Sequence, residues 1–187
     1  MTEKEKAALG LLYQANFDKT LNEERKKAKL LCQKFNTTLY NEMRKKKAII
    51  RELCQTKTNF FHLEPSFWCD YGYNISFGDL FYANHNLTIL DAAKVTFGDS
   101  VFIGPNCGFY TSGHPLDAPQ RNEGLEYAKP INIGNNVWIG GNVVVLPGVT
   151  IGDHSVIGAG SIVTKDIPPH VLAFGNPCQV IKEIPQS

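Results

Sequence analysis

The chain of 187 residues lacks several features that would assign it to particular classes of protein. It has no apolar run long enough to span a bilayer, which excludes a transmembrane helix. Its first residues, Met1-Thr-Glu-Lys-Glu-Lys6, are highly charged and so unlike a secretory signal. Its five cysteines are an odd number and have no C-x-x-C spacing. We therefore expect a cytoplasmic protein with reduced, mostly buried thiols and no membrane partner.

The chain also has little net charge, +1, so a strong overall attraction to polyanions is not expected. The charge is unevenly distributed, because residues 1–58 carry 14 Lys or Arg against 7 Asp or Glu, whereas residues 59–187 carry 5 against 11. The basic runs at residues 26–27 and 45–47 are short and have no interleaved aromatic residues, so nucleic acid is not an expected partner. We interpret the basic segment as solvated helix faces. Attraction of an anionic ligand is the alternative.

From Ile133 onward the sequence repeats every six residues. An aliphatic residue opens each block, and Gly follows it in four of the six blocks, which open at Ile133, Ile139, Val145, Ile151, Ile157 and Val163. A hexapeptide period is typical of a parallel β-helix, in which three blocks form one triangular coil of 18 residues. Glycine after the opening residue suits a sharp bend, or a place where the backbone closely approaches another coil. Residues 133–168 therefore predict two full coils.

The same six-residue phase is present earlier in the chain. Opening positions are occupied by Phe77, Ala83, Ile89, Phe97, Ile103 and Phe109, with two extra residues after the third block. A second apolar position is occupied by Val95, Val101, Cys107, Val137, Val143 and Val149. Two inward residues per block make a continuous apolar column, and each buried aliphatic side chain contributes roughly 1.5–3 kcal/mol. The pattern predicts a mainly β domain over residues 59–187.

Residues 1–58 instead predict an α-helical cap. Thr2 with Glu5, and Thr20 with Glu23, each fit a capping box at the start of a helix. Apolar residues then recur at helical spacing, first Ala28, Leu31, Cys32, Phe35 and Leu39, and later Ile49, Ile50, Leu53 and Cys54. A cap of this kind would cover an end or flank of the solenoid, which otherwise exposes unpaired backbone and apolar surface. Closure over a ligand is the functional alternative.

Residues 110–130 interrupt the repeat with three prolines, two glycines and no six-residue pattern. Such a structureless insertion is usually functional or disordered, and we expect a loop that protrudes from one corner of the coil. His114 opens this loop directly after a strand, as a general base requires, although an ordinary surface histidine also fits. We expect the Trp138 side chain to face outward, where it either forms part of a contact surface or is exposed by chance. Asn84 and Asp70 are further candidate site residues, and both could equally be residues that form turns.

Residues 67–184 resemble the maltose/galactoside O-acetyltransferases, a branch of the hexapeptide-repeat acyltransferases. The matching motifs are Cys-Asp70-Tyr-Gly-Tyr-Asn74, Phe81-Tyr-Ala-Asn84, Thr111-Ser-Gly-His-Pro115, Lys129-Pro-Ile-Asn-Ile-Gly-Asn-Asn-Val-Trp-Ile-Gly-Gly141, Pro147-Gly-Val-Thr-Ile-Gly-Asp153, Ile157-Gly-Ala-Gly-Ser-Ile-Val-Thr-Lys-Asp-Ile-Pro168 and Gly175-Asn-Pro-Cys178. Leu12-Tyr-Gln-Ala-Asn-Phe-Asp18 and Arg25 are similar to the cap of the maltose-acetyltransferase type. The His-Pro loop followed by Asn-Asn-Val-Trp-Ile-Gly is the specific part of this resemblance.

The resemblance implies a left-handed parallel β-helix that assembles as a homotrimer, with active sites between neighbouring subunits. It implies transfer of an acetyl group from acetyl-CoA to a hydroxyl of a maltose-, glucose- or galactoside-like sugar, with no metal required. His114 would be the general base for direct attack, and Asn84 would stabilise the oxyanion. No acyl-enzyme is implied, which agrees with a sequence that offers no clear nucleophile–base pair.

The resemblance also implies roles for binding residues. Asp70 and Asn84 match acceptor-side positions, Asp18 and Arg25 would reach the acceptor from the cap, and Glu126 would contact the acceptor or orient the histidine. Acetyl-CoA would be bound by Trp138, Gly141, Ala159, Thr164, Lys165 and Lys182. Two departures bear on these roles. Ala92 replaces an Asp that some members carry, and Gln179 and Lys182 replace arginines that contact CoA phosphates in some relatives.

Three other readings are compatible with a hexapeptide solenoid. An antibiotic O-acetyltransferase of the streptogramin type would use the same fold with another acceptor. A non-catalytic binding trimer would not depend on His114. A zinc hydrolyase similar to the γ-class carbonic anhydrases would need three histidine ligands, and the five histidines here lack close pairs in the sequence.

Overall fold

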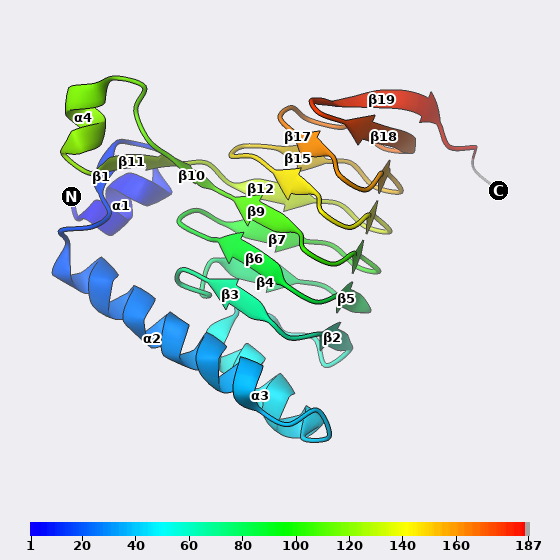
Figure 1. Cartoon of the computed structure of the whole chain (residues 1–187), viewed down its shortest axis with the longest axis horizontal. Coiled ribbons are helices and arrows are strands. Elements are labelled where there is room, and N and C mark those ends of the chain that lie inside the picture. The colour runs from blue at the N-terminus through cyan, green and yellow to red at the C-terminus, as the bar shows by residue number, and fades with distance from the viewer. Residues whose placement is uncertain (186–187) are drawn as a thin grey trace.

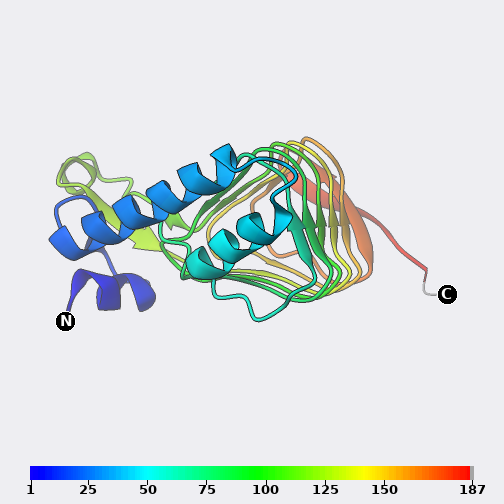
Figure 2. The same cartoon turned by 90° about the horizontal axis from the view of Figure 1, so that it is seen from below.

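The computed structural model describes residues 1–185 and shows a parallel β-helix with helices at its amino-terminal end. The strands stack as nested triangular coils, α3 lies across the open end of the first coil, and α2 extends beyond its side (Figures 1 and 2). Within residues 1–185, no helix combines the length and apolarity needed to cross a membrane. The cytoplasmic location stays a prediction.

The strands form three parallel faces and one small antiparallel sheet. The first face, called the Trp138 face, contains β2 (Phe61–Leu63), β5 (Phe81–Ala83), β8 (Phe102–Ile103), β13 (Trp138–Ile139), β16 (Val156–Ile157), β18 (Val171–Gly175) and the antiparallel β19 (Cys178–Glu183). The second face contains β3 (Phe67–Cys69), β6 (Leu87–Leu90), β9 (Gly108–Tyr110), β14 (Val144–Val145) and β17 (Ile162–Val163). The third face contains β4 (Ile75–Phe77), β7 (Val95–Phe97), β12 (Ile131–Ile133) and β15 (Thr150–Ile151).

The small sheet and the helices belong to the cap and to the insertion. The small sheet has the order β1 (Tyr13–Gln14), β11 (Leu125–Ala128) and β10 (Ser112–Gly113). The helices are α1 (Glu3–Ala8), α2 (Lys19–Thr37), α3 (Met43–Leu53) and α4 (Ala118–Asn122). The small sheet therefore joins the amino-terminal segment to the insertion (Figure 1).

Strand register confirms the six-residue reading of the sequence. Trp138 lies opposite Val156, and Val144 lies opposite Ile162, so adjacent coils are offset by 18 residues in this region. The predicted inward residues are buried, and aromatic rings fill the first coils. Phe77 and Phe81 stack at 4.5 Å between ring centroids, and Phe97 packs 5.0 Å from Phe109. Valine and isoleucine fill the later coils in place of these rings.

The glycines that follow the opening residues lie where neighbouring coils approach closely, as predicted. A Cβ added to Gly134 would lie 2.1 Å from Oδ1 of Asp153 and 2.8 Å from its backbone nitrogen. That same Oδ1 accepts a hydrogen bond of 2.7 Å from the backbone N–H of Asn135. A side chain at this position would therefore displace both the adjacent backbone and a polar contact between coils.

The cap confirms one predicted helix start and contradicts another. Thr2 and Glu5 form the capping box of α1. Thr20 is not the cap of α2, because the helix begins at Lys19 and already includes Thr20, and Asp18 accepts the hydrogen bond from Leu21 N at 2.8 Å. Leu39 does not join the buried stripe, because α2 ends at Thr37 and leaves the Leu39 side chain 67% exposed.

The cap covers an exposed strand edge of the first coil. Asn36 of α2 accepts a hydrogen bond from Phe67 N at 2.8 Å and donates one to Phe67 O at 3.0 Å, so a side-chain amide pairs with the edge of β3. The Phe35 ring meets Phe67 edge-on, and the Cys32 and Cys69 sulfurs lie 3.6 Å apart. All five cysteines are free and buried, as the sequence predicts.

The expectation that residues 110–130 are structureless is wrong. The insertion contains β10, the short helix α4 and β11, and β11 pairs on one side with β10 and on the other with β1 of the cap. Backbone pairing with a strand 113 residues earlier is what orders the segment, and no local pattern in the insertion reveals it.

Gly134→Ala should lower the free energy of unfolding by about 1–3 kcal/mol, since the added methyl group overpacks the contact between coils. Thermal and denaturant unfolding of the variant and the wild type would measure this. An unchanged midpoint would show that the coils can separate at little cost.

Candidate active site

His114 follows β10 and is held by the insertion itself. Its Nδ1 lies 2.9 Å from the carbonyl oxygen of Leu125. A carbonyl can only accept a hydrogen bond, so Nδ1 carries a proton, and in the neutral form of the ring Nε2 is the nitrogen with the free lone pair. The side chain is 47% exposed, so Nε2 is accessible from outside the chain. This is the tautomer and orientation that a general base needs.

Glu126 lies beside this nitrogen and is itself held by the cap. Its Oε1 is 3.9 Å from Nε2 of His114, and its Oε2 accepts a hydrogen bond of 2.9 Å from the Tyr13 hydroxyl. The contact exists because Tyr13 of β1 and Glu126 of β11 are direct partners in the small sheet. Sequence reasoning did not single out Tyr13, since only the pairing of β1 with β11 brings it to the site.

Arg25 and Asp70 form a second polar group near the same sheet. The guanidinium of Arg25 donates to the Tyr71 hydroxyl at 2.6 Å and to Ala15 O at 2.6 Å. Asp70 precedes Tyr71 and is half-buried; burial raises the pKa of its carboxyl group, while Lys29 and Arg25 act in the opposite direction. Burial raises the pKa of Tyr71 to about 12, so its hydroxyl stays protonated. The structure thus places the Arg25 guanidinium near the Asp70 carboxyl group, and their contacts with an acceptor stay a prediction.

A buried carboxylate shapes the turn that carries Asp70. Asp91 is fully buried, and its Oδ1 accepts hydrogen bonds from Tyr71 N at 2.8 Å and Asp70 N at 3.0 Å. Asn74 donates its side-chain amide to the Asp91 backbone carbonyl at 2.7 Å. Burial raises the pKa of Asp91 to about 7, and the amide donors oppose that rise. Asp91 therefore fixes the turn of residues 70–74.

Asp18 has a structural role beside the one expected of it. Its Oδ1 caps α2 through Leu21 N, so that oxygen is occupied by the helix start. Any contact with an acceptor would use Oδ2, and that contact stays a prediction.

Asn84 and His114 lie at different corners of the triangular coil. Asn84 follows β5, in the Asn84 corner (residues 84–86, 140–142 and 158–160), whereas His114 lies in the His114 corner (residues 70–74, 91–94, 111–130 and 164–166). Asn84 Oδ1 accepts a hydrogen bond from His85 N at 2.7 Å, and the N–H donors on Nδ2 take no part in this contact. In residues 1–185 no hydrogen bond joins Asn84 to His114 or to Glu126.

The residues predicted to bind CoA divide between these corners. Trp138 is 58% exposed on β13, and the strand leads directly into Gly141, whose carbonyl accepts a hydrogen bond from Gly160 N at 2.9 Å in the next coil. Ala159 is exposed at this same corner. The remaining positions are exposed in the last coil or on the terminal hairpin, namely Thr164, Lys165 and Lys182.

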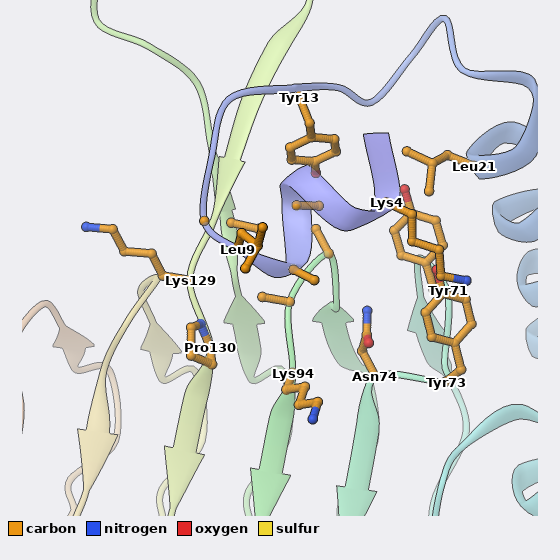
Figure 3. Close-up of a pocket in the computed structure, with 16 residues that line it drawn as sticks. Lys4, Leu9, Tyr13, Leu21, Tyr71, Tyr73, Asn74, Lys94, Lys129 and Pro130 are labelled. Carbon is orange, nitrogen blue, oxygen red and sulfur yellow. The ribbon is translucent and has the colours of Figure 1, made fainter. Parts of the chain in front are cut away.

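A cavity of about 420 Å³ lies next to these polar groups. It is enclosed by α1, the small sheet and the turns of the first coils, and Tyr71 and Tyr73 lie at one end with Lys129 and Pro130 at the other (Figure 3). None of the predicted site residues lines it, but Tyr13 and Tyr71 do. The two tyrosines therefore separate the cavity from the polar groups that their hydroxyls contact.

Asp91→Asn should change how stability depends on pH. The pKa of Asp91 is raised on folding, so the folded chain holds this proton more tightly than the unfolded chain. Wild-type stability should then fall relative to the variant as pH rises from about 4 to about 7, by an amount on the order of a few kcal/mol. Chemical unfolding of both proteins across this range measures how the free energy of unfolding depends on pH. The same pH dependence in the variant and the wild type would contradict the prediction.

Comparison with known proteins agrees with this architecture. Residues 130–165 match the family described as bacterial transferase hexapeptide (six repeats), and residues 6–57 match the maltose acetyltransferase hexapeptide capping motif. The galactoside O-acetyltransferase of Escherichia coli strain K12 is 52% identical over 164 residues, which cover 88% of this chain and 81% of that protein.

Solved structures match over nearly the whole chain. A maltose O-acetyltransferase from Clostridium difficile 630 superimposes with a TM-score of 0.95 and 50% identity, covering 100% of this chain and 99% of that one. A galactoside acetyltransferase in complex with coenzyme A gives a TM-score of 0.92 and 47% identity, covering 99% of this chain and 92% of that one. The chain therefore belongs to the maltose/galactoside O-acetyltransferase family of hexapeptide-repeat acyltransferases, and it is an acetyltransferase.

Proposed function

We propose that this enzyme transfers the acetyl group of acetyl-CoA to a hydroxyl of a maltose-, glucose- or galactoside-like sugar, with His114 as general base. The observation that carries the proposal is the hydrogen bond from Nδ1 of His114 to Leu125 O, which directs an unprotonated Nε2 outward. A base must have its lone pair aimed at the proton that it removes. The names and coenzyme content of the matching structures support acetyl-CoA as the donor.

The proposed reaction is a direct transfer. Nε2 of His114 takes the proton of the acceptor hydroxyl while the hydroxyl oxygen attacks the thioester carbonyl. The resulting oxyanion accepts a hydrogen bond from the Nδ2 group of Asn84, and its collapse breaks the carbon–sulfur bond. The imidazolium then returns the proton to the departing thiolate, so the enzyme ends in its starting state.

We propose a homotrimer because one chain does not bring the base and the oxyanion donor together. His114 and Asn84 occupy different corners of the same coil. Packing of identical prisms around a threefold axis would place the His114 corner of one subunit against the Asn84 corner of the next. Each site would then take its base and acceptor residues from one subunit and its oxyanion donor and CoA groove from another.

In this arrangement the acceptor lies between the cap and the coil. Asp70 and Arg25 offer a carboxylate and a guanidinium for sugar hydroxyls, with Asp18, Asn84 and Glu126 as further contacts. Ala92 removes one carboxylate that some relatives carry, so the acceptor loses a hydrogen-bond partner there. CoA would lie along Trp138, Gly141 and Ala159 toward Thr164 and Lys165. Lys182 would contribute charge for a phosphate.

His114→Ala should lower turnover by several orders of magnitude and leave acetyl-CoA affinity nearly intact. A general base contributes about 10²- to 10⁴-fold, so a loss below about tenfold would contradict the assignment. His154→Asn is a suitable control. His154 is exposed at the third corner with a φ of 60°, where Asn136 of the preceding coil adopts 55°, so the substitution preserves the turn.

The assay is release of the CoA thiol from acetyl-CoA with maltose, glucose, a galactoside or a streptogramin as acceptor. Sugar-dependent release that disappears in His114→Ala supports the proposal. Release with the streptogramin alone would assign the protein to the antibiotic branch. Binding of acetyl-CoA without release for any acceptor would favour a different hydroxyl substrate.

Trp138→Ala should weaken acetyl-CoA binding by about 1–2 kcal/mol with little change in stability, since the indole is largely exposed in the chain. Isothermal titration would measure the affinity. Trp68→Ala is the matched control, because Trp68 is 42% exposed on β3 of another face. Equal acetyl-CoA affinities of the two variants would show that Trp138 does not contact CoA.

A further inference from the structure

The cap places a buried tyrosine hydroxyl at the His114 corner. Tyr13 is 1% exposed, and its ring packs in a small apolar cluster that includes Leu21, Tyr71 and Ala128. Its hydroxyl donates to Oε2 of Glu126 at 2.9 Å. In the view of Figure 3, the Tyr13 ring lies at the edge of the cavity.

Glu126 is thereby held by one oxygen and faces the histidine with the other. Its Oε1 lies 3.9 Å from Nε2 of His114, too far for a hydrogen bond. A carboxylate at that distance still attracts the imidazolium that forms when Nε2 takes a proton, and the attraction is strong where water is excluded. Its effect depends on the carboxylate staying in place during the reaction.

The strand that carries Tyr13 is fixed at several points. Gln14 donates its side-chain amide to Glu123 O at 3.0 Å, and its backbone N–H donates to Glu3 at 2.5 Å. Arg25 holds the following residue through the Ala15 carbonyl at 2.6 Å. Burial, and after it the Glu126 carboxylate, raise the pKa of Tyr13, so the phenol is protonated and remains a donor near neutral pH.

We propose that Tyr13 is a positioning residue for acetyl transfer, and that its hydroxyl holds Glu126 beside Nε2 of His114 so that the carboxylate stabilises the imidazolium. The inference rests on the proposed function, because it requires His114 to accept the acceptor's proton. Tyr13 itself neither gains nor loses a proton. The cap would then contribute to the chemical step, as well as covering the coil.

Tyr13→Phe tests this by removing the hydroxyl and keeping the buried ring. Tyr73→Phe is the matched control, because Tyr73 lines the same cavity but donates its hydroxyl to Glu24 at 2.6 Å. With acetyl-CoA and a sugar acceptor at saturation, we expect kcat to fall about tenfold in Tyr13→Phe and to stay within about twofold of wild type in Tyr73→Phe. KM for acetyl-CoA should stay within about twofold in both variants.

A double-mutant cycle separates positioning from packing. If Tyr13 acts through Glu126, adding Tyr13→Phe to Glu126→Gln should lower kcat by less than about twofold further. Independent, multiplicative losses would overturn the inference. So would a Tyr13→Phe variant whose kcat matches that of Tyr73→Phe.

A crystal structure of Tyr13→Phe gives a test that needs no acceptor. The Glu126 carboxylate should move away from His114 or occupy several positions. A carboxylate that keeps its place beside Nε2 would overturn the inference. Failure of the proposed function has a different signature, namely a fully active His114→Ala. An inactive His114→Ala together with a wild-type-like Tyr13→Phe would leave His114 as the base and reject Tyr13 alone.

Discussion

Close stacking of the backbone between successive coils is the constraint on which the rest of this structure depends. Each coil must lie near enough to the next for strand pairing, so several positions after the inward residues have no space for a side chain. Gly104 shows this directly, because an added Cβ would lie 2.5 Å from the backbone nitrogen of Gly141. The same stacking makes the faces straight and rigid, and it fixes the angle at which each corner leaves the column. The insertion that carries His114 therefore starts from a fixed point.

The fold was predictable from the sequence because its determinants are local and repeated. A six-residue period specifies inward and outward positions and the places where coils touch, and the strand register follows it. The starts and ends of the cap helices were less predictable. Thr20 and Asp18 both suit an N-cap, and only the folded helix shows that Asp18 takes the role. Leu39 continues the apolar spacing of its helix but lies beyond its last turn.

The sequence suggested residues for the candidate site, but it did not reveal the contacts that hold them. His114 stands out because it opens a break in the period, and the family resemblance supplies partners for it. The hydrogen bond to Leu125 and the contacts of Tyr13 depend on pairing between segments far apart in the sequence, which no periodicity describes. Asn84 and His114 illustrate a different limit. The two residues lie at different corners of a single chain, so the joint role proposed for them would require assembly of several chains.

The pairing of β1 with β11 has a consequence for the order in which the molecule forms. A solenoid can grow coil by coil, since each turn needs only its neighbour. The Tyr13–Glu126 contact instead closes a loop of 113 residues, which carries a larger entropic cost than pairing one coil with the next. During synthesis, β1 cannot pair with β11 until this part of the third coil has emerged from the ribosome. The first coils can therefore stack before the small sheet that joins the amino-terminal segment to the insertion is complete.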